Sequence, residues 1–344
     1  MRDLGVTFRT GRGLFGGGHV VRAVDGVSLA LAEGRTLALV GESGSGKSTI
    51  GRAILRLVDP DAGTVELRGR DLTRLSGAAL RRARREVQMV FQDPYSSLDP
   101  ILPVGRSIGE PLEVHTRLGR RARERRVAEL LELVGLRADQ ADRLPHEFSG
   151  GQRQRLAIAR ALAVTPKVVV CDEAVSALDV STQNQVIDLL ERLQRELGVS
   201  YLFISHDLSV VRHVAHDVAV LYLGKLVEQG PVERVFAATA HPYTQALLAA
   251  VPQPRPGAGA RRRVLLRGDL AVDAPEQGCA LHPRCPHAMD VCRTTAPEPV
   301  EVPGGGSVSC HLHTTGPALG GRPLAELSAA PVPAAPVGAA PAPT

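Results

Sequence analysis

A glycine-rich loop at residues 41–49 constrains the fold of this chain more than any other segment. It reads Gly-Glu-Ser-Gly-Ser-Gly-Lys-Ser-Thr, follows the apolar run Thr36–Val40 and precedes a helical pattern over Ser48–Leu57. A strand, a Gly-x-x-x-x-Gly-Lys-Ser loop and a helix in this order predict an α/β fold. Backbone N–H groups and the helix N-terminus would then surround a phosphate. We therefore expect a nucleoside triphosphate site here.

The chemistry of the loop assigns a role to each of its parts. The glycines allow the backbone to approach the β-phosphate closely. Lys47 adds a cation for the β- and γ-phosphates, and the Ser48 hydroxyl is expected to ligate Mg²⁺. The predicted nucleotide contacts are Gly41, Glu42, Ser43, Gly44, Ser45, Gly46, Lys47, Ser48 and Thr49.

Two acidic residues end a second apolar run, Val168–Cys171. Continuous apolar runs of this kind are typical of parallel strands buried on both faces. Asp172 stands where a strand-terminal carboxylate holds Mg²⁺ through water. Glu173 is expected to face the γ-phosphate and polarise the attacking water, as a general base or an orienting group. ATP and Mg²⁺ are therefore the predicted cofactors.

A four-residue segment, which we call the signature, lies between the phosphate loop and the acidic pair and consists of Ser149, Gly150, Gly151 and Gln152. The three elements in this order resemble the ATP-binding cassette (ABC) ATPases, and the resemblance covers Val20 to about Gly230. It implies that the N-terminus of the helix after Ser149 contacts the γ-phosphate of ATP held by a second subunit. Dimerisation with a second ATPase subunit is then part of the mechanism.

The same resemblance implies roles for three further residues. Gln92 would sense Mg²⁺ and water and add a ligand to the metal beside Ser48 and Asp172. Asp179 belongs to a loop that would cross to the partner subunit. His206, which follows the apolar run Tyr201–Ile204, resembles the switch histidine that contacts the γ-phosphate. The predicted catalytic set is Glu173, His206 and Gln92.

The sequence departs from the family pattern in three places. Phe148 replaces the usual Leu before the signature, and Ala174 replaces the Pro that often follows the acidic pair. Neither change removes a phosphate contact. For the aromatic ring that usually stacks on adenine we choose Phe15, with Phe8 and His19 as open alternatives.

A finer resemblance concerns one branch of the family. The segment Gln92–Pro100 and the run Ala177–Ser181 look like the oligopeptide/dipeptide/nickel import ATPases. That resemblance implies a peripheral subunit at the cytoplasmic face of the membrane, beneath two integral membrane permease subunits. The second ATPase subunit would be an identical chain or a paralogue, and an extracytoplasmic solute-binding protein would deliver the solute.

ATP hydrolysis is then expected to drive uptake of di- or oligopeptides. Nickel or another small solute, and a soluble non-transport ABC ATPase, stay open as alternatives. The net charge of +5 comes from arginine, and the sequence has only three lysines, Lys47, Lys167 and Lys225. This bias makes the basic charge weak support for a nucleic-acid partner, and none is expected.

A group of cysteines marks the C-terminal part of the chain. Cys279, Cys285, Cys292 and Cys310 are separated by five, six and seventeen residues. Four thiolates can hold Zn²⁺ or an iron–sulfur cluster. By resemblance we favour a [4Fe-4S] cluster with a structural role. Zinc stays open, including a mixed site with nearby histidines.

The predicted fold is an α/β P-loop NTPase core with an antiparallel β subdomain, an inserted helical subdomain and a small Cys-bearing C-terminal extension. Alternating segments such as Val27–Leu31 and Val65–Leu67 predict the antiparallel strands. We expect an ABC ATPase domain over 1–235, with the helical subdomain at about 77–165. The C-terminal region would cover 236–315, and a Pro/Ala-rich tail over 316–344 would be disordered.

Overall fold

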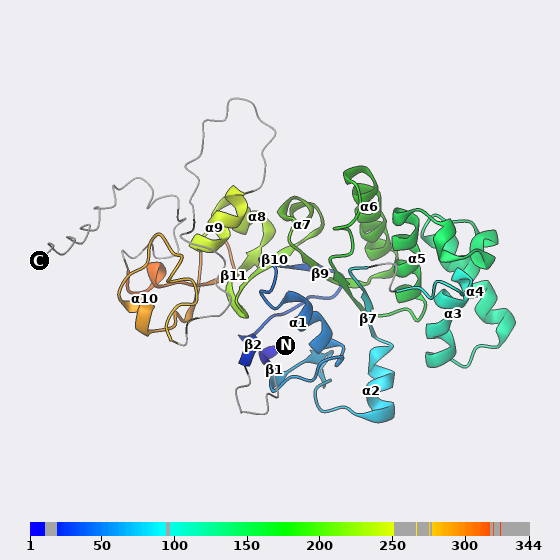
Figure 1. The fold of residues 1–344 in the computed structure, drawn as a ribbon, viewed down its shortest axis with the longest axis horizontal. Helices are drawn as coiled ribbons and strands as arrows, with labels where there is room; N and C mark the ends of the chain where they lie inside the picture. Colours follow the sequence, from blue (N-terminus) through cyan, green and yellow to red (C-terminus); the bar gives the residue numbers. More distant parts are fainter. Residues whose placement is uncertain are drawn as a thin grey trace, which may run out of the picture.

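A mixed β-sheet runs through the centre of the molecule in the computed structural model (Figure 1). The structure describes residues 1–10, 19–93, 97–250, 266, 275, 277–316, 319 and 324. The sheet has eight strands, in the spatial order β12 (Pro299–Glu301), β13 (Ser307–Ser309), β11 (Lys225–Pro231), β10 (Asp217–Tyr222), β3 (Thr36–Val40), β9 (Ser200–Ser205), β8 (Val168–Asp172) and β7 (Val87–Val90). Neighbours from β10 to β7 are parallel, and β11, β13 and β12 join antiparallel.

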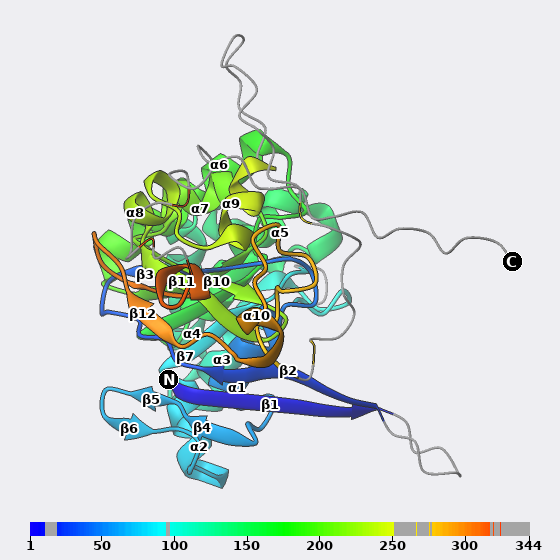
Figure 2. The ribbon, with the colours of Figure 1, turned by 90° about the vertical axis from the view of Figure 1, so that its left-hand side faces the viewer.

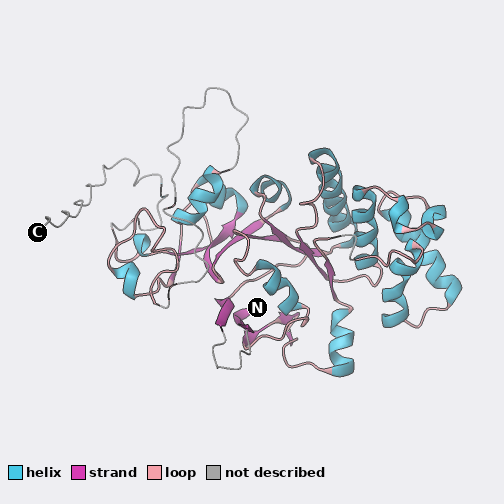
Figure 3. Cartoon of the chain, in the orientation of Figure 1, coloured by secondary structure: helices cyan, strands magenta, loops and turns pink. Residues whose placement is uncertain are grey.

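Helices lie on both sides of this sheet (Figure 3). Their bounds are α1 (Lys47–Ile54), α2 (Gly77–Arg84), α3 (Val104–His115), α4 (Arg120–Leu133), α5 (Gly150–Leu162), α6 (Val180–Leu197), α7 (Leu208–Val214), α8 (Val232–Ala237), α9 (Pro242–Ala249) and α10 (Val291–Thr294). Short 3₁₀ turns are η1 (Ala138–Asp142), η2 (Pro145–Glu147) and η3 (His311–His313). In the part of the chain that the structure describes, no helix combines the length and apolarity needed to cross a membrane.

The continuous apolar runs of the central strands are explained by burial on both faces. Along β8, Val169 and Cys171 pack with the cluster that includes α3 to α6. Val170 points the other way, into the cluster that contains Leu39 of β3 and Ile50 of α1. Alternate residues of a strand face opposite sides, so both sets must be apolar. The predicted parallel strands are confirmed.

A separate antiparallel layer lies below the main sheet in Figure 2. It contains β1 (Arg2–Thr10), β2 (His19–Val27) and β4 (Ala62–Thr64), beside the short pair β5 (Glu66–Leu67) and β6 (Arg70–Asp71). The strand expected over Val27–Leu31 is wrong, because β2 ends at Val27. Leu29 is nevertheless buried, and its N–H bonds to the Met1 carbonyl at 3.1 Å. Its alternation with the exposed neighbours Ser28 and Ala30 therefore reflects burial and a single backbone pair with Met1, beyond the end of β2.

Helices α3, α4 and α5 pack into one lobe beside β7 and β8 (Figure 1). The apolar face expected on α4 is buried, with Val127, Leu130 and Leu131 inside. Gly135 follows the helix with a positive φ of 75°, a conformation that favours glycine. The range of about 77–165 also includes β7, which pairs with β8 in the main sheet.

The C-terminal region extends the main sheet. Strand β13 pairs antiparallel with β11, and β12 pairs with β13. Two residues from the range 316–344, Leu319 and Leu324, are described and buried against this region, 2% and 0% exposed. They differ from the expected disordered tail because leucine side chains can fill an apolar cluster even within a Pro/Ala-rich segment. The remainder of the predicted tail, apart from Gly316, lies outside the described residues.

Candidate active site

The loop between β3 and α1 has the backbone that its glycines predict. Gly41, Gly44 and Gly46 have φ values of 154°, 79° and 99°, a region that L side chains rarely adopt. A Cβ on Gly41 would lie 2.2 Å from the Leu221 carbonyl oxygen, and one on Gly46 would lie 2.1 Å from that of Ala23. Both positions therefore require glycine for conformation and for space.

Lys47 lies inside this loop. Its ammonium donates to the carbonyl oxygens of Gly41 at 2.8 Å and Glu42 at 2.7 Å, and to Ser45 Oγ at 3.2 Å. Burial lowers the pKa of Lys47, whereas the nearby carboxylates oppose that shift. The loop backbone thus holds a buried cation where a phosphate anion would bind.

A hydroxyl and a carboxylate meet beside the lysine. Ser48 Oγ donates to Asp172 Oδ1 at 2.8 Å, which joins the start of α1 to the end of β8. Burial raises the pKa of Asp172, partly offset by the Ser48 hydrogen bond. Mg²⁺ prefers hard oxygen ligands and commonly binds one or two carboxylates together with substrate phosphates. These two side chains fit that ion.

Glu173 contacts the two other residues that were predicted to be catalytic, Gln92 and His206. Gln92 Nε2 donates to Glu173 Oε2 at 2.8 Å, and His206 Nδ1 lies 3.3 Å from Glu173 Oε1. The Glu173 backbone has a φ of 48°, and its N–H bonds to the Ile204 carbonyl at 3.0 Å. A non-glycine residue at positive φ is a strained conformation that clusters at functional sites. The side chain thereby contacts Gln92, which follows β7, and His206, which follows β9.

The signature segment forms the N-terminus of α5. Ser149 and Gln152 make a reciprocal capping box, with Gln152 N to Ser149 Oγ at 3.3 Å and Ser149 N to Gln152 Oε1 at 2.9 Å. Ser149 and Gly150 are exposed. The free end of the helix therefore presents backbone N–H groups and its positive dipole end to the surface.

The signature is packed against the loop that carries Asp179. A Cβ on Gly151 would lie 2.2 Å from Thr182 Cγ2. Asp179 caps α6 by accepting from Thr182 N at 3.0 Å and Thr182 Oγ1 at 2.7 Å. Hydrogen bonds from Thr182 hold the pKa of the Asp179 carboxyl below its usual range. The structure thus gathers the predicted residues into two groups, one around Lys47 and Glu173 and one around Gly151 and Asp179.

Sequence reasoning missed two side chains that reach the phosphate loop from the C-terminal region. Glu42 N–H donates to Tyr243 Oη at 2.8 Å, and Arg284 Nη1 donates to Glu42 Oε2 at 3.2 Å. The contacts span 201 and 242 residues of sequence. No local pattern predicts such pairs. The adenine prediction, Phe15, lies outside the described residues.

The four C-terminal cysteines are electrostatic neighbours. Burial raises the pKa of Cys310 to about 12, with smaller contributions from Cys285, Cys279 and Cys292. A tetrahedral zinc site places its sulfurs about 3.8 Å apart, since each Zn–S bond is about 2.3 Å. Among the described residues, the four sulfurs are not gathered within 4.8 Å of one another. The spacing of these four sulfurs therefore differs from that of ligands to a single tetrahedral zinc ion.

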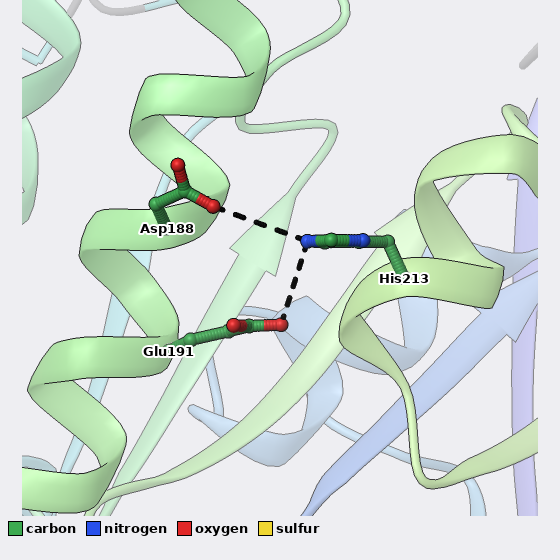
Figure 4. Close-up of side chains that lie close together, drawn as sticks. All are labelled: Asp188, Glu191 and His213. Atoms are coloured by element: carbon green, nitrogen blue, oxygen red, sulfur yellow. Dashed lines mark ion pairs between the residues drawn. The ribbon is translucent and has the colours of Figure 1, made fainter.

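Among the described residues, one group of possible metal ligands does lie within 4.8 Å of one another: Asp188 and Glu191 of α6 and His213 of α7 (Figure 4). His213 Nε2 is 3.9 Å from Asp188 Oδ1 and 3.7 Å from Glu191 Oε1. The His213 and Asp188 side chains are well exposed. Exposed contacts at this distance contribute little to stability, and the cluster lies apart from the ATP-site motifs in sequence.

Comparisons with known proteins agree with this geometry. Residues 24–176 match the ABC transporter family, and residues 227–292 match the family described as oligopeptide/dipeptide transporter, C-terminal region. A probable peptide ABC transporter ATP-binding protein of Sinorhizobium fredii is 51% identical over 90% of this chain and 88% of its own length. An oligopeptide transport ATP-binding protein of Bacillus subtilis is 50% identical over 86% of this chain and 90% of its length.

A solved structure shares the fold of this chain. It is a dimeric post-hydrolysis state of the ATP-binding cassette MJ0796 bound to ADP and Pi. Its TM-score is 0.60 at 30% identity, and the match covers 67% of this chain and 97% of that one.

Proposed function

We propose that this chain, which belongs to the ATP-binding subunits of peptide-importing ABC transporters, hydrolyses ATP to drive peptide uptake across the cytoplasmic membrane. The observation that carries this proposal is the contact of Glu173 with Gln92 and His206, next to the Ser48–Asp172 pair. A carboxylate, a metal-ligand pair and a phosphate loop in one place are the parts that phosphoryl transfer to water needs. The relatives' names extend this chemistry to peptide import.

In this account the phosphates of ATP lie along the loop of residues 41–49, with Lys47 between the β- and γ-phosphates. Ser48, Asp172 and Gln92 would hold Mg²⁺, which supplies positive charge to the phosphate oxygens. Glu173 accepts a hydrogen bond from the attacking water and takes or orients its proton. His206 holds the Glu173 carboxylate and reaches the γ-phosphate.

The second ATPase subunit completes the site. The exposed N-terminus of α5, capped by Ser149, would bind the γ-phosphate of ATP held by the partner. Gly151 packs against Thr182, and Thr182 binds Asp179. The position of Asp179 would therefore change when the N-terminus of α5 binds or releases that phosphate. ATP therefore closes the pair, and loss of phosphate after hydrolysis opens it.

The membrane partners would be two permease subunits at the cytoplasmic face, supplied by an extracytoplasmic solute-binding protein. Two exposed apolar side chains in the segment that follows Gln92 support this docking, because Ile101 is 79% exposed and Leu102 is 39% exposed. Exposed apolar side chains beside a site element mark a surface that a partner can cover. The neighbouring residues 94–96 lie outside the described residues.

We further propose that Cys279, Cys285, Cys292 and Cys310 bind a metal group, with [4Fe-4S] favoured over zinc. Cys285, Cys292 and Cys310 are buried and Cys279 is partly buried, and the other three thiols raise the pKa of Cys310, which supports a shared site. Metal analysis of the purified chain tests this: each Cys→Ser variant should lose iron, and full occupancy in such a variant contradicts the proposal.

Uptake by cells tests the transport function. Cells that carry Glu173→Gln in place of the wild type should lose uptake of labelled peptide, because the ATP cycle stops. Dipeptide, longer peptide and Ni²⁺ are measured in parallel, which separates peptide from nickel import. Glu196→Gln, an exposed glutamate at the end of α6, is the matched control and should retain uptake. Unchanged peptide uptake in a strain without redundant transporters would contradict peptide import.

A further inference from the structure

Two side chains of the C-terminal region hold one residue of the phosphate loop. Tyr243 at the start of α9 accepts a hydrogen bond from the backbone N–H of Glu42 at 2.8 Å. Arg284, next to Cys285, donates from Nη1 to the Glu42 carboxylate at 3.2 Å. Tyr243 is 0% exposed and Arg284 is 9% exposed. Both contacts are therefore made from the packed interior of the C-terminal region.

The Tyr243 contact fixes a peptide plane that also orients Lys47. The plane joins Gly41 and Glu42, so the Gly41 carbonyl and the Glu42 N–H belong to one rigid unit. Tyr243 holds the N–H end of this unit, and Lys47 Nζ donates to its carbonyl end at 2.8 Å. Rotation of the plane would break both bonds. The tyrosine hydroxyl thus sets the direction of a carbonyl that positions the catalytic lysine.

The Arg284 contact concerns charge. Glu42 is an acidic residue within a loop that receives a triphosphate, and it influences the pKa of Lys47. An unpaired carboxylate there would repel the phosphates and compete for the lysine. The Arg284 guanidinium neutralises the Glu42 carboxylate at 3.2 Å and also lies 6.0 Å from the Tyr222 ring centroid. Tyr222 in turn packs on Tyr243, with ring centroids 4.6 Å apart.

A buried network fixes the position of Tyr243. His241 caps α9 by accepting from Tyr243 N at 3.1 Å. Glu228 of β11 accepts from the N–H groups of Ala240 and His241, each at 3.0 Å, and pairs with buried Arg234. The start of α9 is therefore tied to the main sheet. It is a rigid support for the loop.

We propose that the C-terminal region positions the phosphate loop for ATP, with Tyr243 and Arg284 acting as positioning residues through Glu42. The proposal rests on the ATPase function above and adds two residues that hold the phosphate loop without contacting the nucleotide. Because Arg284 adjoins Cys285, a rearrangement of the Cys-bearing segment reaches Glu42 through one side chain. Neither residue touches the reacting atoms, so their effect is on ATP binding more than on the chemical step.

Steady-state ATPase kinetics of the full-length protein test the Arg284 contact. Arg284→Gln should raise the KM for ATP about 5- to 10-fold and change kcat less than 2-fold, since a charge-assisted hydrogen bond is lost. Adding Glu42→Gln should bring KM back to within about 2-fold of the wild type, because the unpaired charge is gone. Arg293→Gln, an exposed arginine of α10, is the matched control.

The Tyr243 contact is tested by Tyr243→Phe, which keeps the ring packing and removes only the acceptor oxygen. KM for ATP should rise about 3-fold or more, with kcat nearly unchanged. Tyr201→Phe is the matched control, because the Tyr201 hydroxyl has no hydrogen-bond partner among the described residues. Melting temperatures are recorded for every variant, so that a KM change is compared at equal folding.

The outcomes separate the two proposals. Suppose that the wild type hydrolyses ATP, and that Arg284→Gln and Tyr243→Phe have the same KM for ATP as the wild type. The positioning proposal is then wrong and the ATPase proposal stands. If adding Glu42→Gln does not bring the KM for ATP of Arg284→Gln back toward the wild-type value, the charge argument is wrong. If the wild type itself neither binds nor hydrolyses ATP, the proposed function fails and the positioning proposal fails with it.

Discussion

Replacing Gly151 with alanine tests the packing that joins the signature helix to the loop carrying Asp179. The new Cβ would lie 2.2 Å from Thr182 Cγ2, whereas carbon atoms in contact prefer about 3.5–4.0 Å. The shortfall is about 1.3 Å or more. Thr182 cannot simply rotate away, because its Oγ1 donates to Asp179 Oδ2 at 2.7 Å. Either α5 and α6 separate, or the Asp179 cap is broken.

The magnitude follows from two terms. Overpacking of a tight contact costs about 1–3 kcal/mol, whereas rotation of Thr182 to relieve the clash would break its hydrogen bond to Asp179. Alanine in a helix is favoured over glycine by about 1 kcal/mol. The difference is about 0–2 kcal/mol, so we expect Gly151→Ala to lower the free energy of unfolding by about 1 kcal/mol.

A second variant isolates the cause. Thr182→Ser removes the Cγ2 methyl that clashes and keeps the hydroxyl that binds Asp179. Denaturant unfolding of Gly151→Ala, Thr182→Ser and the double variant gives the coupling between the two sites. The double variant should recover the stability lost by Gly151→Ala. Equal stability of Gly151→Ala and the wild type, or no recovery in the double variant, would refute the packing argument.

Three further predictions concern the loop, the core and the pH dependence. Lys47→Ala should abolish productive ATP binding, measured by nucleotide titration, because a buried cation is removed from the phosphate site; binding at wild-type affinity would contradict its role. Tyr201→Phe should leave the free energy of unfolding unchanged or raise it by up to about 1 kcal/mol, since it deletes a buried hydroxyl without a partner; a loss above about 1 kcal/mol would show that the hydroxyl is bonded. Burial lowers the pKa of His241 to about 3, so between pH about 6.5 and about 3 the unfolded chain binds a proton that the folded chain does not. The free energy of unfolding should therefore fall as pH decreases through this window, by at most about 1.4 kcal/mol per pH unit from this group. In denaturant unfolding at several pH values, the free energy of unfolding of His241→Asn should depend less steeply on pH than that of the wild type; an equal pH dependence would contradict the assignment.

The sequence predicts the centre of this molecule well, because local patterns suffice there. The apolar runs at Thr36–Val40 and Val168–Cys171 must be buried on both faces, and the loop after the first needs its glycines. The roles of Gln92 and His206 were expected only through family resemblance, and their contacts with Glu173 were not predicted. Their geometry depends on β8 and β9 being neighbours, which no single segment reveals.

The rest depends on contacts between distant parts of the chain. Strand β13 joins β11 although it has only three residues, Ser307–Ser309, and its apolar content is too small to predict a strand. Tyr243 and Arg284 reach Glu42 across more than 200 residues. Leu29 alternates with exposed neighbours as a strand residue would, yet it lies beyond the end of β2. Side-chain burial and strand pairing give the same local pattern in such short segments.

ATP turnover of Glu173→Gln is the most direct test of the central claim, that Glu173 activates water beside a Mg²⁺ and phosphate site. Nucleotide binding, ATP-dependent dimerisation and phosphate release are measured on the wild type, Glu173→Gln and the control Glu196→Gln. The account predicts that Glu173→Gln binds ATP and dimerises like the wild type but releases almost no phosphate, while Glu196→Gln turns over normally. Near-normal phosphate release by Glu173→Gln would contradict it.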